Sequence, residues 1–209
     1  GSNPTIAFLA SGIEGIKVRV TAKAETEAEA RQLLEAEEAE LRAVLADAVF
    51  GADEETMEHA VGRLLSERGL WLALAESVTG GLMASRIVAV PGASQWFRGS
   101  VVAYDPAVKR DVLGVPEGPV VSAEAARAMA EGARRVLHAD VGLGVTGVAG
   151  PEPSEGHPPG TVFYSQVGPG QLVQTNRLQL PGDRDRVREF GALSVLGSLF
   201  RSLLAAEGT

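Results

Sequence analysis

Residues 70–81, Leu-Trp-Leu-Ala-Leu-Ala-Glu-Ser-Val-Thr-Gly-Gly, decide the fold of this 209-residue chain. The apolar run over 70–75 predicts a short buried strand, and a helix is expected from about Thr79 to Val88. A buried strand that leads directly into a helix is typical of α/β proteins, in which helices cover a sheet. The segment therefore indicates an α/β fold.

Strand and helix patterns alternate outward from this segment. A helix with one apolar stripe is expected over 54–68. Further strands are expected over 99–104, 140–146, 160–167 and 173–180, and further helices over 122–138 and 183–206. We therefore predict one domain over 52–209 with a mixed β-sheet flanked by helices. Its proline-rich stretch 151–159 is expected to be a mobile surface loop.

A smaller unit is predicted over residues 3–51. Residues 16–22 alternate apolar and polar side chains, which indicates a half-buried strand. Residues 26–44 are rich in alanine, glutamate, leucine and arginine, which favour a helix. A small βα(β) unit is expected, and at this size its stability alone is doubtful.

Composition excludes several classes of function. The formal net charge is −8, which disfavours direct binding of nucleic acid. The chain contains no cysteine, so disulfides, zinc–thiolate sites and thiol nucleophiles are excluded. No apolar run approaches the ~18 residues of a membrane span, and the first residues lack the pattern of a signal peptide. A cytoplasmic protein without a membrane partner is expected.

The sequence Glu76-Ser-Val-Thr-Gly-Gly81 is a candidate anion site. It lies at the carboxyl end of the predicted strand, where ligands bind in open α/β sheets. Gly80 and Gly81 allow a close approach of the backbone, and the free amides of a first helical turn attract a phosphate or carboxylate. Ser77 and Thr79 add hydroxyl groups. The alternative is that one of these hydroxyls only caps the helix.

A second candidate combines Ser94, in a loop that follows a glycine, with Tyr104 and Lys109 after the next strand. A serine becomes a nucleophile when a base takes its proton, and a buried neutral lysine can act as that base. This requires a large decrease of the lysine pKa. The alternative is an exposed lysine, a capping serine and a core tyrosine.

Two further segments complete the set of candidates. Thr146, Gly147 and Gly150 lie at the end of another predicted strand, where they could form a second wall of the pocket or only an ordinary turn from strand to loop. Arg184 and Arg188 lie in the first turns of the last helix, where a positive charge opposes the helix dipole, so a partner elsewhere is expected. That partner is either a carboxylate or a substrate phosphate. The three histidines share no motif, and no metal site is expected.

These motifs, with Val121-Ser-Ala-Glu-Ala-Ala-Arg and Gly160-Thr-Val, resemble the C-terminal domain of the CinA family of competence/damage-inducible proteins. The likeness extends over about 53–205. Residues 3–51 resemble the small KH-type subdomain that precedes this domain. Full-length members carry a larger N-terminal domain similar to molybdenum-cofactor-biosynthesis proteins. The chain is therefore expected to correspond to a C-terminal part, with that missing domain as one partner.

The resemblance implies a nicotinamide-nucleotide amidohydrolase that needs no cofactor and converts nicotinamide mononucleotide to nicotinic acid mononucleotide and ammonia. It implies Ser94 as the nucleophile, Lys109 as the base and Tyr104 as the assisting group. The implied substrate-binding residues are Glu76, Ser77, Thr79, Gly80, Gly81, Thr146, Gly147, Gly150, Arg184 and Arg188.

One departure from the family concerns the loop after Gly150-Pro151, which is usually rich in glycine but reads Glu152-Pro-Ser-Glu-Gly-His157 here. Its acidic residues are expected to repel a phosphate. A homodimer is also expected. The alternative to an enzyme is a nucleotide-sensing or protein-binding module of a competence or damage-response protein. A third alternative is an active domain that serves mainly to position the missing one.

Overall fold

The computed structural model describes residues 3–10, 12, 15–170 and 172–206. It divides into two compact units, residues 1–56 and 57–209, which are described separately. The expected boundary at 51/52 lies five residues before this division. No described helix is long and apolar enough to cross a lipid bilayer.

The N-terminal unit is a β-hairpin followed by a helix. Strands β1 (Thr5–Ala10) and β2 (Ile16–Thr21) pair antiparallel, and helix α1 (Glu27–Leu45) and the short helix η2 (Ala46–Ala48) follow. Thr26 begins α1 with a capping box, in which its hydroxyl accepts from the Glu29 amide and the Glu29 carboxylate accepts from the Thr26 amide. The predicted strand and helix are present. The strand β1, which was not predicted, precedes them. Within this unit, the described residues after α1 form no third strand.

The C-terminal unit is a five-stranded mixed sheet between helices, as predicted. The strands are β3 (Leu72–Glu76), β4 (Phe97–Val102), β5 (Val141–Gly147), β6 (Thr161–Val167) and β7 (Val173–Gln179), in the order β4-β3-β5-β6-β7. β3 is parallel to both of its neighbours, whereas β6 is antiparallel to β5 and to β7. The helices are α2 (Met57–Glu67), α3 (Leu82–Val88), α4 (Pro106–Asp111), α5 (Ala123–Val136) and α6 (Arg184–Ala205), with η3 (Ala93–Gln95) before β4.

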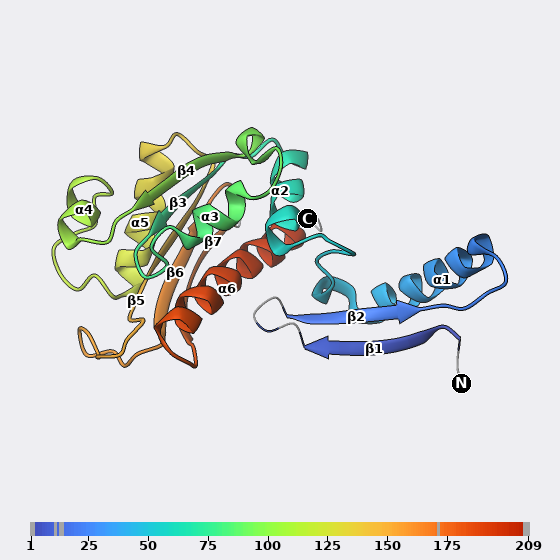
Figure 1. Ribbon diagram of the computed structural model, residues 1–209. Coiled ribbons are helices and arrows are strands. Elements are labelled where there is room, and N and C mark those ends of the chain that lie inside the picture. The colour runs from blue at the N-terminus through green and yellow to red at the C-terminus, as the bar shows by residue number, and fades with distance from the viewer. Residues whose placement is uncertain (1–2, 11, 13–14, 171, 207–209) are drawn as a thin grey trace. The chain divides into compact units, whose positions relative to one another are not determined.

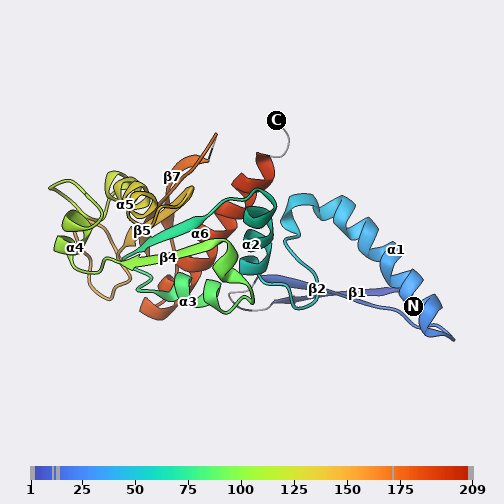
Figure 2. The same cartoon turned by 90° about the horizontal axis from the view of Figure 1, so that it is seen from above.

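Helices cover both faces of this sheet. α5 packs on β3, β5 and β6, while α2 and α3 pack with α6 on the other face (Figures 1 and 2). The contact between α5 and β5 is very close, because a Cβ atom added to Gly142 or Gly144 would lie within 2.2 Å of a backbone oxygen of α5. All five residues of β3 are buried, which explains why its sequence is apolar as far as Ala75.

Helix boundaries follow the capping residues. The side chains of Ser122 and Asp183 accept from the amides of Ala125 and Arg186 and begin α5 and α6, as predicted. α3 starts at Leu82 rather than at Thr79, because Gly80 and Gly81 have φ values of 61° and 92°, outside the helical region. α4 was absent from the prediction, although an Asp cap followed by proline, Asp105-Pro106, is a recognised helix start.

Candidate active site

A cavity of about 160 Å³ lies at the carboxyl ends of β3, β4 and β5. In open α/β sheets this edge is where loops converge to bind ligands. The cavity is lined by Ser77, Val78, Tyr104, Pro106, Lys109, Val120, Val121, Thr146, Gly147, Ala149 and Arg184. Six of the predicted site residues are therefore brought together here: Ser77, Tyr104, Lys109, Thr146, Gly147 and Arg184.

Lys109 is the central ionisable group of this cavity. Its side chain extends from α4 and is only 2% exposed, and its Nζ donates to the backbone oxygen of Tyr104 at 3.2 Å. Burial lowers the pKa of Lys109 below its ordinary value of 10.5, while the charges of Asp105 and Glu155 act in the opposite direction. The larger effect favours a neutral amine, which can accept a proton.

Ser77 is the hydroxyl residue that shares the cavity with Lys109. It follows β3 directly, its amide donates to the Val145 oxygen at 2.9 Å, and the residue is 8% exposed. Its hydroxyl has no hydrogen-bond partner among the described residues, and the amide of the next residue, Val78, has no acceptor among them either. A free hydroxyl beside a free amide is the arrangement needed by a nucleophile and an oxyanion donor.

Tyr104 and Arg184 lie together at the exposed side of the cavity. The Arg184 guanidinium donates to the Tyr104 hydroxyl at 2.6 Å and to the Gly150 oxygen at 3.0 Å. Tyr104 is 59% exposed, so it is not the core tyrosine of the alternative interpretation. The bonded pair links the start of α6 to the segment after β4. A guanidinium has five N–H donors, so Arg184 retains donors for an anion.

Ser94 does not reach this cavity, which contradicts its predicted pairing with Lys109. It lies exposed in η3, before the first residue of β4, whereas Lys109 and Tyr104 follow the last residue of β4. Since a strand advances about 3.3 Å per residue, five residue steps from Phe97 to Val102 place the two edges about 16 Å apart. Ser94 therefore cannot give its proton to Lys109.

The predicted anion site at the start of α3 is occupied by Glu76. Its carboxylate is 0% exposed and accepts from three backbone amides, of Gly81, Met83 and Ala84. It also accepts from the hydroxyls of Thr79, at 2.8 Å, and Ser100, at 3.0 Å. A substrate phosphate cannot bind these amides while the carboxylate holds them. Glu76 and Thr79 therefore hold the turn in place and do not reach the cavity.

The remaining predicted residues support the walls. Arg188 donates to the Thr79 oxygen at 3.3 Å and packs near Gly80, outside the cavity lining. The Thr146 hydroxyl donates to the Val120 oxygen at 2.7 Å. Gly150 is not in the lining, but its oxygen fixes Arg184. Sequence reasoning did not identify Val120 and Val121, because an apolar pair in a loop carries no signal for a pocket.

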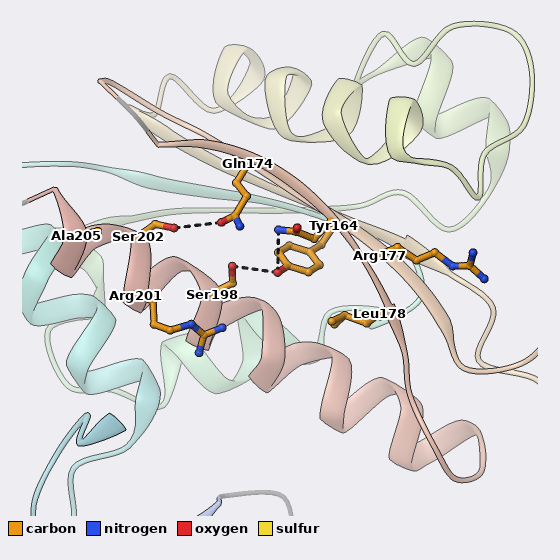
Figure 3. Close-up of a pocket in the computed structure, with 9 residues that line it drawn as sticks. Tyr164, Gln174, Arg177, Leu178, Ser198, Arg201, Ser202 and Ala205 are labelled. Atoms are coloured by element: carbon orange, nitrogen blue, oxygen red, sulfur yellow. Dashed lines mark hydrogen bonds between the residues drawn. The ribbon is translucent and has the colours of Figure 1, made fainter. Parts of the chain in front are cut away.

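A larger, more open cavity of about 380 Å³ lies between β7 and the last turns of α6 (Figure 3). Its polar side chains bind one another: the Tyr164 hydroxyl donates to Ser198, Asn176 donates to Tyr164, and Ser202 donates to Gln174. Residues that the sequence singled out are absent from its lining. The smaller cavity is therefore the candidate active site. No group of three or more acidic or histidine side chains in the described parts of the chain can hold a metal ion.

Comparisons with known proteins match both units. Residues 54–203 match the family model of the CinA C-terminal domain, and residues 1–51 match that of the KH domain of damage-inducible protein CinA. A CinA-like protein of Frankia casuarinae is 46% identical over 97% of this chain and 47% of its own length. One from Dictyoglomus thermophilum is 41% identical over 97% of this chain and 50% of its own length. The chain thus spans about half the length of these curated relatives.

Solved structures match about three quarters of the chain. A crystal structure of a competence-damaged protein (CinA) superfamily protein from Klebsiella pneumoniae is 30% identical, with a TM-score of 0.68 over 71% of this chain and 96% of that one. A competence/damage inducible protein from Agrobacterium tumefaciens is 28% identical, with a TM-score of 0.62 over 76% of this chain and 98% of that one.

Proposed function

The chain belongs to the CinA family, and on this premise we propose that it is an amidohydrolase that deamidates nicotinamide mononucleotide to nicotinic acid mononucleotide and ammonia. The observation that carries this proposal is the buried Lys109, with its lowered pKa, in one cavity with the free hydroxyl of Ser77. The nucleophile is Ser77 and not the predicted Ser94.

The chemical steps use three side chains of the cavity. Lys109, neutral, takes the hydroxyl proton as Ser77 Oγ attacks the carboxamide carbon. The Val78 amide donates a hydrogen bond to the oxyanion. Loss of such a donor raises the activation free energy by about 3–4 kcal/mol in comparable sites. The carbon–nitrogen bond then breaks, and the Lys109 ammonium returns the proton to the departing ammonia with the help of Tyr104. Lys109 then takes a proton from water, the resulting hydroxide attacks the acyl ester, and the Lys109 ammonium returns the proton to Ser77 Oγ as the carbon–oxygen bond breaks and the acid product leaves.

The dimensions of the cavity indicate how the substrate enters. At about 160 Å³ it is smaller than the roughly 300–1,000 Å³ of pockets that enclose whole ligands. It accommodates the carboxamide and part of the pyridine ring, while the ribose phosphate remains near the mouth. Arg184, with its unused donors, is the cation that lines this cavity beside Lys109, and we assign the phosphate to it. This replaces the predicted phosphate position at the start of α3.

Measuring ammonia release from nicotinamide mononucleotide tests this proposal. Ser77→Ala and Lys109→Ala are expected to lower turnover by about 10³-fold or more, because each removes a member of one catalytic unit. Ser94→Ala is the matched control and should retain wild-type turnover, since Ser94 lies at the opposite end of the sheet. Near-wild-type turnover in a folded Ser77→Ala protein would refute the mechanism. Tight binding without turnover by the wild-type protein would instead support a nucleotide-sensing module.

A further inference from the structure

Glu155 lies at the tip of a tight turn in the loop that was expected to be mobile. Ser154 and His157 exchange two backbone hydrogen bonds, of 3.1 and 2.9 Å, around Glu155 and Gly156. Both central residues have positive φ, 49° for Glu155 and 78° for Gly156. A glutamate in this region is unfavourable, because its Cβ crowds the backbone, and such residues persist where other contacts hold them.

The contacts that hold Glu155 belong to the wall of the active-site cavity. Its two carboxylate oxygens accept from successive backbone amides, those of Val120 at 3.2 Å and Val121 at 2.7 Å. Both valines line the cavity. The same wall is held from the sheet side by Thr146, whose hydroxyl donates to the Val120 oxygen. The wall segment is therefore held between a strand residue and a loop carboxylate.

The charge of Glu155 also acts on Lys109. The charged and titratable groups around the Lys109 amine are Asp105 at the start of α4, Glu155 of the loop, and Tyr104 and Arg184 across the cavity. Asp105 and Glu155 both favour the protonated amine, against the effect of burial. Asp105 already has a capping role, since it accepts from the Ala107 amide at 2.7 Å. Glu155 is the acid that reaches Lys109 from outside α4.

We propose that Glu155 is a positioning residue of this site. It fixes the Val120–Val121 wall through both carboxylate oxygens, and it places a negative charge near Lys109. This inference rests on the proposed function only for its activity measurement. Its second measurement, the titration of Lys109, is independent of any reaction.

The experiment uses four variants of the full chain. Glu155→Gln keeps the size of the side chain but removes its charge, and Glu155→Asp restores the charge. Glu155→Gly removes the carboxylate while relieving the unfavourable φ, so this variant is expected to fold. Glu152→Gln, at an exposed position of the same loop, is the matched control for charge. Circular dichroism establishes that each variant is folded.

The titration of Lys109 can be followed directly, because the sequence has only three lysines, at 17, 23 and 109. With ¹³C-labelled lysine, NMR resolves their Cε signals, and Lys17 and Lys23 of the other unit act as internal references. The Lys109 signal of Glu155→Gln and Glu155→Gly should titrate at a lower pH than in the wild-type protein. Glu152→Gln and Glu155→Asp should titrate as the wild type.

The activity measurement follows kcat/KM against pH. The rising limb, which requires neutral Lys109, should move to lower pH in Glu155→Gln, while Glu155→Gly should in addition lose about tenfold or more at the optimum because the wall is no longer fixed. Unchanged Lys109 titration in both Glu155→Gln and Glu155→Gly would overturn the inference, as would an equal shift in Glu152→Gln. Absence of ammonia release by the wild type would refute the proposed function, and the titration would still decide the role of Glu155.

Discussion

Among single residues, Lys109 combines the role of the base in the proposed mechanism with a cost to stability. Its pKa is lower in the folded protein than in the unfolded chain, which therefore binds the proton more readily. The cost is complete below the folded pKa, decreases as the pH rises toward the unfolded value of about 10.5, and disappears above it. Stability and function thus oppose each other at this position.

Replacing Lys109 by methionine should make the protein more stable at neutral pH. We expect a gain of roughly 0.5–2 kcal/mol in the free energy of unfolding at pH 7, because methionine fills the same space without a charge. The difference from the wild type should shrink as the pH approaches 10.5. Urea unfolding at both pH values measures it, with the exposed Lys23→Met as the control. A Lys109→Met protein less stable than the wild type at pH 7 would contradict this account.

The sequence could identify the residue types of the site better than their arrangement. Ser77, Tyr104, Lys109, Thr146 and Arg184 were selected and lie in one cavity. Ser94 was expected to be the nucleophile because the family resemblance implied it. Ser94 lies before β4 and Lys109 after it, so the length of this strand, which was predicted over 99–104, already separates the two side chains. The internal carboxylate of Glu76 also escaped prediction, because an acidic residue in a glycine-rich turn does not reveal which amides it accepts.

Among the elements, the contact between β5 and α5 depends on two glycines. A Cβ at Gly144 would lie 2.2 Å from the Ala126 oxygen and 2.5 Å from the Ala130 amide nitrogen, and backbone atoms cannot move aside cheaply. Gly144→Ala should therefore destabilise the protein by about 3 kcal/mol or more. Gly197→Ala, in helix α6, is the control, because its nearest neighbours are side-chain atoms at 3.6 and 3.7 Å.

Thermal and denaturant unfolding of these two variants provide the measurement. Gly197→Ala should be neutral or slightly stabilising, since alanine favours a helix over glycine. Equal stability of the Gly144→Ala and wild-type proteins would mean that α5 can withdraw from β5 without loss. The apolar strand at β5 was predictable from the sequence. The sequence did not predict that α5 packs against the glycines of β5, because an alternating glycine pattern indicates a close neighbour without identifying it.

For the whole molecule, the order of the strands in the sheet is the feature that could not be predicted from the sequence. The α/β class, the mixed sheet and most elements follow from periodicity and capping residues. The position of β3 between β4 and β5 does not, since α3, η3, β4, α4 and α5 all lie between β3 and β5 in the chain. This order places the ends of three parallel strands side by side, and the cavity exists because of it.

All residues of the candidate site belong to the unit formed by residues 57–209. The match to the Klebsiella pneumoniae structure covers 96% of that protein but only 71% of this chain, so that structure is much shorter than this chain. A protein of residues 54–209 is therefore expected to fold and to keep kcat/KM for ammonia release within about threefold of the full chain. Circular dichroism and the ammonia assay test this. A folded but inactive truncation would show that residues 1–53 take part in the reaction.

The buried carboxylate of Glu76 has a consequence for competition by small anions. It is tethered one residue before the turn whose amides it holds, so its effective concentration there far exceeds the roughly millimolar values reached through flexible linkers. Dissolved phosphate or sulfate at millimolar concentration cannot displace it. The amides at the start of α3 thus remain occupied by Glu76, and dissolved anions are expected to bind at donors that are free, such as those of Arg184 at the cavity mouth.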